Sequence, residues 1–389
     1  MGEKLLDTPL IWAEVDLNAV AHNVRALRRI TNPDARLMAV VKADAYGHGA
    51  LEVARRALEN GADALGVARL NEGIELRNAG FDAPILIFGY TLPALARKLV
   101  DFDLTQTVWS YQTAEALSAA VPSGKPINIH IKIDSGMGRL GLLPDCRRLP
   151  APGADSTMNA LREVELIARL PGLRLEGVYT HFASADSADK SYAVKQFETF
   201  MEFLDDLGKA GIDVPVRHAA NSAAIIDMPE THLDLVRPGI SIYGLYPSDE
   251  VDQRRIQLKP AMALKARVVH LKKVPAGFKI SYGMTYETQA PTTIASVPVG
   301  YADGFSRLLS SRGQMLVGGR RAPIVGRVCM DQTMLDVGHI PDVELEDEVV
   351  VFGRQGDEMI SADEIAAALN TINYEIVSAL TARIPIIYL

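Results

Sequence analysis

Short apolar runs alternate with amphipathic segments over the first two-thirds of the chain. Eight runs have the length and composition of buried parallel strands: 37–41, 64–68, 85–88, 104–108, 127–133, 175–181, 216–220 and 233–237. Apolar positions at helical spacing occur between them, at 50–59, 71–78, 113–120, 158–169 and 193–209. Because alternating strands and helices favour a parallel sheet with right-handed crossovers, eight such units predict a (β/α)8 barrel of the TIM type.

The pattern changes near residue 261. Short segments rich in β-branched residues predict strands at 264–269, 293–299, 315–317, 324–328, 334–337 and 348–352, with one helix at 362–369. The predicted fold class is therefore α/β + β, an N-terminal barrel in 1–250 followed by a mainly-β domain in 251–389. The linker between them is expected within 246–259, and the proline-rich segment 143–157 predicts a surface loop.

Composition narrows the classes of function. A formal net charge of -8 without a basic stripe argues against a nucleic-acid partner. Cys146 and Cys329 are too few for a disulfide framework or a cysteine metal site, which fits a reducing cytoplasm. No signal-peptide core and no uncharged apolar run of about eighteen residues is present, so we expect a cytoplasmic protein with no membrane partner and no metal.

Lys42 stands at the end of the first predicted strand, where a desolvated site would begin. Burial disfavours the ammonium form and leaves an amine that can react with a carbonyl group. The following turn, Gly47-His48-Gly49, allows the backbone to approach a ligand closely. A lone lysine here would more often reach to solvent from a strand end. The other strand ends favour the functional interpretation.

Polar residues follow four further predicted strands, and barrel enzymes place their chemistry at this rim. The residues concerned are Arg139, His181, Asn221 with Ser222, and Arg237 with Gly239 and Ile240. Ser222 and the amides of Gly239 and Ile240 follow strands seven and eight, the usual phosphate position in such barrels. A phosphorylated aldehyde held beside a lysine suggests pyridoxal 5′-phosphate (PLP). Ser222 would alternatively serve as a helix N-cap.

Seven further motifs, in order, accompany AVVKADAYGHG (39–49). They are HIKIDSGMGR (130–139), YTHFA (179–183), HAANS (218–222), VRPG (236–239), SYG (281–283), PVGYADG (298–304) and VCMD (328–331). On these motifs the chain resembles the bacterial alanine racemases, PLP-dependent enzymes of fold type III, over nearly its whole length. The 143–157 loop looks longer than the usual connection in that family.

The resemblance implies interconversion of L-alanine and D-alanine by two bases, in support of peptidoglycan synthesis. Lys42 is expected to exchange the Cα proton of D-alanine, and Tyr282 that of L-alanine from the opposite face. Two facing bases are needed because one base would return its proton to the side from which it came. Tyr282 needs a cationic or hydrogen-bonding neighbour to lose its proton, and His181 and Arg237 are the candidates. As isolated residues, Tyr282 would be read as a strand aromatic and Arg237 as a rim ion-pair residue.

The remaining roles are also carried over by resemblance. The implied cofactor-binding residues are Lys42, Tyr46, His181, Asn221, Ser222, Arg237, Gly239, Ile240 and Tyr374. Arg139 and the backbone N–H of Met330 are implied to bind the substrate carboxylate, and Lys132 is a possible carbamyl-lysine that would hold Arg139. The implied entryway residues are Asp186, Tyr301, Arg307, Arg327 and Ile372.

The resemblance implies a homodimer in which Tyr282 and Met330 complete the partner's barrel site. Three alternatives stay open: a serine racemase, a broad-specificity amino-acid racemase, and a PLP carrier without catalysis. Carriers resemble the barrel alone, so the residues after 259 count against the last. Side-chain preference depends on the shape of the binding site, which the sequence does not reveal.

Overall fold

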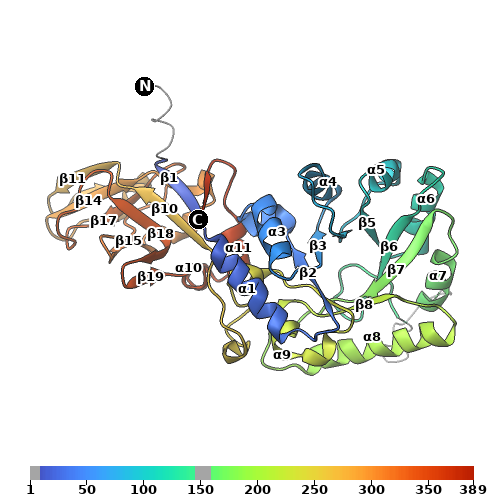
Figure 1. The fold of residues 1–389 in the computed structure, drawn as a ribbon. Helices are drawn as coiled ribbons and strands as arrows, with labels where there is room; N and C mark the ends of the chain where they lie inside the picture. Colours follow the sequence, from blue (N-terminus) through green and yellow to red (C-terminus); the bar gives the residue numbers. More distant parts are fainter. Residues whose placement is uncertain (1–8, 145–158) are drawn as a thin grey trace. The chain divides into compact units, whose positions relative to one another are not determined.

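A computed structural model describes residues 9–144 and 159–389 (Figure 1). The chain forms two compact units. One contains residues 19–45 and 50–259, and the other contains the stretch ending at Asn18 together with 46–49 and 260–389. The long C-terminal part of the second unit therefore begins at Pro260 instead of residue 251, and the unit takes in residues 9–18, which the sequence had placed with the barrel.

Eight parallel strands form the barrel unit, as predicted. In sheet order they are β8 (Val216–His218), β7 (Leu173–Tyr179), β6 (Ile127–Lys132), β5 (Thr105–Val108), β4 (Ile85–Ile87), β3 (Ala64–Val67), β2 (Arg36–Val40) and β9 (Leu235–Val236). A parallel bridge between Asn221 and Arg237 links the two ends of this order, so the barrel is nearly closed. All eight predicted strands are confirmed, with ends that differ by at most two residues.

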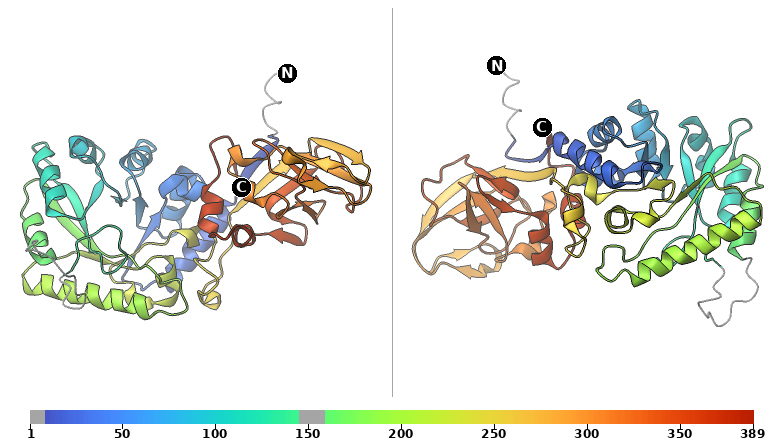
Figure 2. Two further views of the ribbon diagram at one scale, coloured as in Figure 1. Left: turned by 180° about the vertical axis from the view of Figure 1, so that it is seen from behind. Right: turned by 60° about the horizontal axis from the view of Figure 1, so that its bottom comes forward.

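Helices alternate with the strands, and each of them buries apolar residues. They are α1 (Leu17–Ile30), α3 (Ala50–Glu59), α4 (Leu70–Asn78), α5 (Ala96–Asp101), α6 (Tyr111–Ala120), α7 (Ala160–Ile167), α8 (Ser191–Lys209) and α9 (Ser222–Asp227). In α8, Ala193, Phe200, Phe203 and Leu207 are buried. This long helix lies along the outside of the barrel strands in both views of Figure 2.

The turn after β2 has an unusual backbone. α2 (Lys42–Gly47) contains four consecutive non-glycine residues with φ between +51° and +55°, from Ala43 to Tyr46, and Gly47 has φ +82°. These values lie in the left-handed region that L-residues avoid. Glu72 supports the start of the turn, since its Oε1 accepts a hydrogen bond of 2.7 Å from the N–H of Ala43.

The second unit is mainly β, as predicted. Its largest sheet has the order β16 (Arg320–Pro323), β15 (Gln314–Val317), β18 (Glu348–Gln355), β10 (Met262–Arg267), β1 (Ile11–Val15) and β20 (Ile386–Tyr388), with β19 (Glu358–Ile360) paired to β18. Two smaller sheets contain β11 (His270–Val274), β14 (Thr292–Val297) and β17 (Thr333–Asp336), and β12 (Lys279–Ile280) with β13 (Tyr286–Glu287). Helix α10 (Ala362–Leu369) matches its prediction, and α11 (Asn373–Ser378) was not foreseen.

One predicted strand differs from the structure, and one predicted loop lies mostly outside the residues that the structure describes. The predicted strand 324–328 is wrong, because the strand is β16 and Ile324 makes only an isolated bridge to Leu335. The expected surface loop at 143–157 lies almost entirely outside the described residues, as does Cys146. Within the ranges 9–144 and 159–389, no helix is long and apolar enough to cross a membrane.

Candidate active site

Lys42 follows β2 at the C-terminal end of the barrel, where the sequence predicts the site. Burial lowers the pKa of Lys42, and the charge of Arg139 lowers it further, while the charge of Glu72 opposes both effects. Glu72 also accepts hydrogen bonds from the N–H groups of Ala68 and Arg69, at 2.7 and 2.9 Å. The carboxylate is thus fixed by backbone donors, and the lysine is biased toward the neutral amine.

Arg139 is positioned by the turn that precedes it. Asp134, at 7% exposure, accepts hydrogen bonds from four successive N–H groups, those of residues 136 to 139, at 2.8–3.1 Å. Burial alone would raise the pKa of Asp134, but these hydrogen bonds lower it below its usual value. The ionised carboxylate therefore holds the turn that carries Arg139.

Arg237 and His181 occupy the buried centre of the rim. The Arg237 guanidinium is 4% exposed and donates to the carbonyl oxygens of Thr180 and Ala219, at 2.8 and 3.0 Å. Its Nη2 also lies 3.3 Å from Nδ1 of His181. Burial lowers the pKa of Arg237 to about 10, so the guanidinium stays charged near neutral pH.

The rim has an excess of positive charge. Burial lowers the pKa of His181 well below its usual value, and the charges of Arg237, Lys132, Arg139 and Lys42 all lower it further. Burial likewise lowers the pKa of Lys132 to about 7, and the positive charges of Arg237 and Arg139 contribute to this decrease. Like charges gathered in a low-dielectric site are unfavourable unless an anion neutralises them. These positively charged groups therefore fit an anionic ligand, such as PLP.

Ser222 and Gly239 come together as expected of a phosphate-binding rim. Ser222 Oγ is buried and accepts from the N–H groups of Gly239 and Ser241, at 2.9 and 3.4 Å. The N-cap of α9 is Asn221, whose side chain accepts from the N–H of Ala224 at 3.0 Å. The alternative of Ser222 as the N-cap is therefore wrong, which leaves its hydroxyl available at the rim beside Ile240.

Tyr46 and Tyr374 belong to the second unit and lie side by side there. Their ring centroids are 6.2 Å apart, with the planes tilted by 49°. Gly47 lies directly against α11, since a Cβ at this position would be 2.5 Å from the carbonyl oxygen of Val377. The segment 46–49 and the helix carrying Tyr374 thus form one packed element, as two tyrosines that share one ligand would require.

Tyr282 and Met330 are also in the second unit, and both side chains face solvent there, at 70% and 53% exposure. Tyr282 lies in a tight turn beside Arg327, whose guanidinium carbon would be 3.4 Å from a Cβ placed on Gly283. Tyr301 is adjacent to the Met330 segment, since its N–H donates to the carbonyl oxygen of Cys329 at 3.1 Å. Side chains as exposed as these two are available for contact with another surface.

The other two entryway candidates of this unit lie at the ends of short helices. Arg307 begins the turn η7 (Arg307–Leu309), and Ile372, at 59% exposure, precedes α11. Within the part of the chain that the structure describes, neither residue forms a hydrogen bond with Tyr282.

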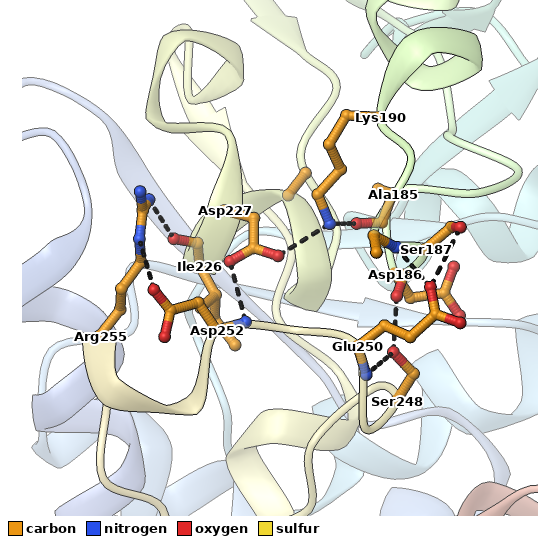
Figure 3. A network of polar contacts seen from close by, with 12 residues as sticks. Ala185, Asp186, Ser187, Lys190, Ile226, Asp227, Ser248, Glu250, Asp252 and Arg255 are labelled. Atoms are coloured by element: carbon orange, nitrogen blue, oxygen red, sulfur yellow. Dashed lines mark hydrogen bonds and ion pairs between the residues drawn. The ribbon is translucent and has the colours of Figure 1, made fainter.

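Asp186 lies on the loop after β7, and Figure 3 shows how that loop is held. Ser248 Oγ donates to the carbonyl oxygen of Asp186 at 2.5 Å. Glu250 accepts from the N–H of Ala188 at 2.5 Å and from Ser187 Oγ at 3.2 Å. Lys190 donates to the carbonyl oxygen of Ala185 and to Asp227, each at 2.8 Å. Ser248 and Glu250, in the segment that follows the last barrel strand, therefore hold the Asp186 loop in place.

Three polar residues on the barrel strands were missed by the sequence analysis: His130, His218 and Glu176. His130 and His218 are 4% and 0% exposed, and their nearest ring nitrogens are 2.8 Å apart. The sequence does hold a signal, because His130 and Lys132 are two residues apart and must share one face of β6. That face points to the barrel interior, where polar side chains need partners.

Comparisons with known proteins agree on one family. Family models described as "Alanine racemase, N-terminal domain" and "Alanine racemase, C-terminal domain" match residues 15–247 and 261–388. Curated relatives named alanine racemase from Desulfosudis oleivorans and Methanococcus maripaludis are 58% and 52% identical to this chain. Each alignment covers 97% of this chain, and 96% and 98% of the two relatives.

Solved structures give the same picture. An alanine racemase from Clostridium difficile 630 superposes with a TM-score of 0.90 at 40% identity, covering 98% of this chain and 96% of that one. The Bacillus anthracis enzyme with bound L-Ala-P gives 0.89 at 40% identity, covering 98% and 95%. A Clostridium difficile 630 alanine racemase in complex with cycloserine gives 0.88 at 38% identity, covering 98% and 96%.

Proposed function

Since this chain belongs to the alanine racemase family, we propose that it interconverts L-alanine and D-alanine with PLP held at Lys42. The observation that carries the proposal is a partly buried lysine of lowered pKa among cationic groups that suit an anionic ligand. When bound, PLP withdraws electrons from the amino acid and makes its Cα proton acidic. All other steps fall to side chains of the protein.

Lys42 is the first base. Its lowered pKa provides a neutral amine that can accept the Cα proton of D-alanine on one face and return it. Tyr282 is the second base and serves L-alanine from the opposite face. Arg139 and the backbone N–H of Met330 bind the substrate carboxylate, because a guanidinium and an amide N–H both donate to oxygen.

Arg237 faces the ring nitrogen of the cofactor in this proposal. A guanidinium of pKa about 10 donates a hydrogen bond without giving up its proton near neutral pH. The ring nitrogen then stays unprotonated and withdraws electrons less strongly, which disfavours side reactions. Tyr46, Tyr374, Ser222, Gly239 and Ile240 serve the phosphate, while His181 and Asn221 complete the cofactor site.

Lys132 is proposed to carry a carbamate. Its pKa of about 7 leaves a substantial share of neutral amine, the form that attacks CO2. The resulting negative charge would lie among Arg139 and Arg237, both of which lower the pKa of the uncarbamylated lysine. The modification would therefore convert a repulsive group into a partner for Arg139.

The proposed assembly is a homodimer with shared sites. Tyr282 and Met330 face solvent in the second unit, and each would complete the barrel site of the partner. Asp186, Tyr301, Arg307, Arg327 and Ile372 would form the entryway, whose charges suit a small zwitterion. We further propose that the enzyme works in the cytoplasm and supplies D-alanine for peptidoglycan.

The test is D-alanine formation from L-alanine by the purified protein with added PLP. The wild type should be active, and Lys42→Ala and Tyr282→Phe should each lose most of the activity. Lys98→Ala and Tyr90→Phe change exposed residues of the same types and should retain it. Failure of the wild type on alanine, but turnover of serine, would redirect the proposal to another racemase. Binding of PLP without turnover of any amino acid would favour the carrier.

Shared sites have a separate test. Mixed Lys42→Ala and Tyr282→Phe chains should regain activity, because each heterodimer would hold one site with both bases intact. If subunit exchange is demonstrated by mass spectrometry and no activity returns, the two bases do not come from different chains.

A further inference from the structure

Arg237 meets an imidazole where a buried guanidinium would ordinarily meet a carboxylate. Its Nη1 lies 2.8 Å from Nδ1 of His218, inside the barrel. Guanidinium nitrogens only donate, so Nδ1 of His218 must be unprotonated and accept. Arg237 in its observed position is therefore compatible with only one neutral tautomer of His218, the one that carries its proton on Nε2.

That constraint passes to a second histidine. Nε2 of His218 lies 2.8 Å from Nδ1 of His130. Burial lowers the pKa of His218 well below its usual value, and burial also lowers that of His130, so both rings are neutral near pH 7. A neutral imidazole carries one N–H, which in His218 must be on Nε2 and donate to His130. His130 then carries its own proton on Nε2.

Glu176 ends this series. Its Oε2 lies 3.4 Å from Nε2 of His130, and it also accepts from Thr105 Oγ1 at 3.3 Å. The hydrogen bond with His130 lowers the pKa of Glu176, so the carboxylate is ionised and can only accept. Its side chain is 31% exposed, against 5% for His130. All donors thus point one way, from Arg237 through His218 and His130 to a carboxylate that water reaches.

The surrounding residues keep both rings in place. The ring of Tyr179 stacks on His218 with centroids 4.7 Å apart and planes 14° apart. Gly177 is opposite His130 in the β6–β7 register, and a Cβ there would lie 2.7 Å from Cε1 of His130. Both imidazoles are thus packed against neighbouring residues, and the positions of their protons decide whether the series can form.

We propose that Glu176 is a positioning residue for Arg237, acting through His130 and His218. This inference rests on the proposed function, in which Arg237 faces the cofactor. Without an acceptor at Glu176, the histidine pair can adopt the reverse tautomers, which place an N–H on Nδ1 of His218. The N–H groups of Arg237 and His218 would then face each other, and Arg237 would move away from its observed position.

The test uses the PLP-loaded protein, in which all eight histidines are labelled with 15N. In the wild type, the ring-nitrogen spectra should show His218 and His130 as neutral Nε2–H tautomers. Glu176→Leu removes the acceptor and should shift both toward Nδ1–H. Glu176→Gln keeps an acceptor oxygen and should preserve the wild-type tautomers, and it also serves if the leucine variant folds poorly. Glu198→Leu changes an exposed carboxylate of α8 and is the matched control.

Racemisation is measured on the same samples. We expect Glu176→Leu to lower kcat roughly tenfold, about 1.4 kcal/mol, with a smaller change in the KM for alanine. Glu176→Gln should lose roughly threefold, about 0.6 kcal/mol in the barrier. An Nδ1–H or doubly protonated His218 in the wild type would overturn the proposal, as would unchanged tautomers in Glu176→Leu. If the tautomers shift in Glu176→Leu but its kcat equals that of Glu198→Leu, the proposal is also overturned, because the series of hydrogen bonds would then have no effect on Arg237. A wild type inactive on alanine would overturn the proposed function, while the tautomers would still report on the series.

Discussion

Carbamylation of Lys132 can be tested directly, because its nitrogen must be neutral to react. With a pKa of about 7 in place of 10.5, about three quarters of the amine is neutral at about pH 7.5, against about one in a thousand for an ordinary lysine. The nitrogen attacks the carbon of CO2, an N–C bond forms, one C–O π bond opens, and a proton leaves to solvent. Replacing Lys132 with Met removes the amine but keeps a long apolar side chain.

The assay is 13C NMR with labelled bicarbonate at constant dissolved CO2. Between about pH 6 and pH 8 the neutral share of Lys132 rises about tenfold, so the carbamate signal should grow at least as steeply. Lys98→Met, an exposed lysine change, should keep the signal, and Lys132→Met should lose it. Loss of a charged partner for Arg139 should raise the KM for alanine roughly tenfold. Equal spectra from the wild type and Lys132→Met would refute the reasoning.

Three further outcomes are expected. Ala43→Gly should raise the free energy of unfolding by about 1 kcal/mol in urea denaturation, because φ +53° is costly for alanine; a loss of stability would contradict the strain. Glu250→Ala should raise the KM for alanine roughly threefold with little change in kcat, because it frees the Asp186 loop; unchanged kinetics would remove that loop from substrate entry. Ser222→Ala should weaken PLP binding roughly tenfold in an absorbance titration; unaltered affinity would show that Ser222 Oγ binds only the N–H groups of Gly239 and Ser241.

The barrel was predictable because its strands are apolar runs that end in polar residues at one rim. Even β9, which is two residues long, was found, since its run ends in Arg237. The strand at 320–323 was not found, because two arginines and a proline conceal it, and an edge strand tolerates all three. The strand was instead predicted at 324–328, because Ile324 and Val325 are apolar and β-branched.

The rim residues were predictable, whereas their mutual charge effects were not. Sequence places Lys132 on a strand, but its lowered pKa needs burial together with Arg237 and Arg139, which come from other parts of the chain. The His130–His218 contact joins residues 88 positions apart, so no local pattern reveals it. Strand pairing determines such contacts, and pairing is a property of the folded barrel.

The backbone turn that begins at Lys42 is left-handed. A right-handed turn suits L-residues, and residues 43–46 form its mirror image, which D-residues would adopt without a clash between Cβ and the carbonyl oxygen. A D-alanine introduced by chemical ligation at position 43 would therefore fit better than the L-alanine that the ribosome places there. In a protein proposed to invert alanine, the segment beside Lys42 is thus one in which the backbone conformation favours a D-residue over an L-residue.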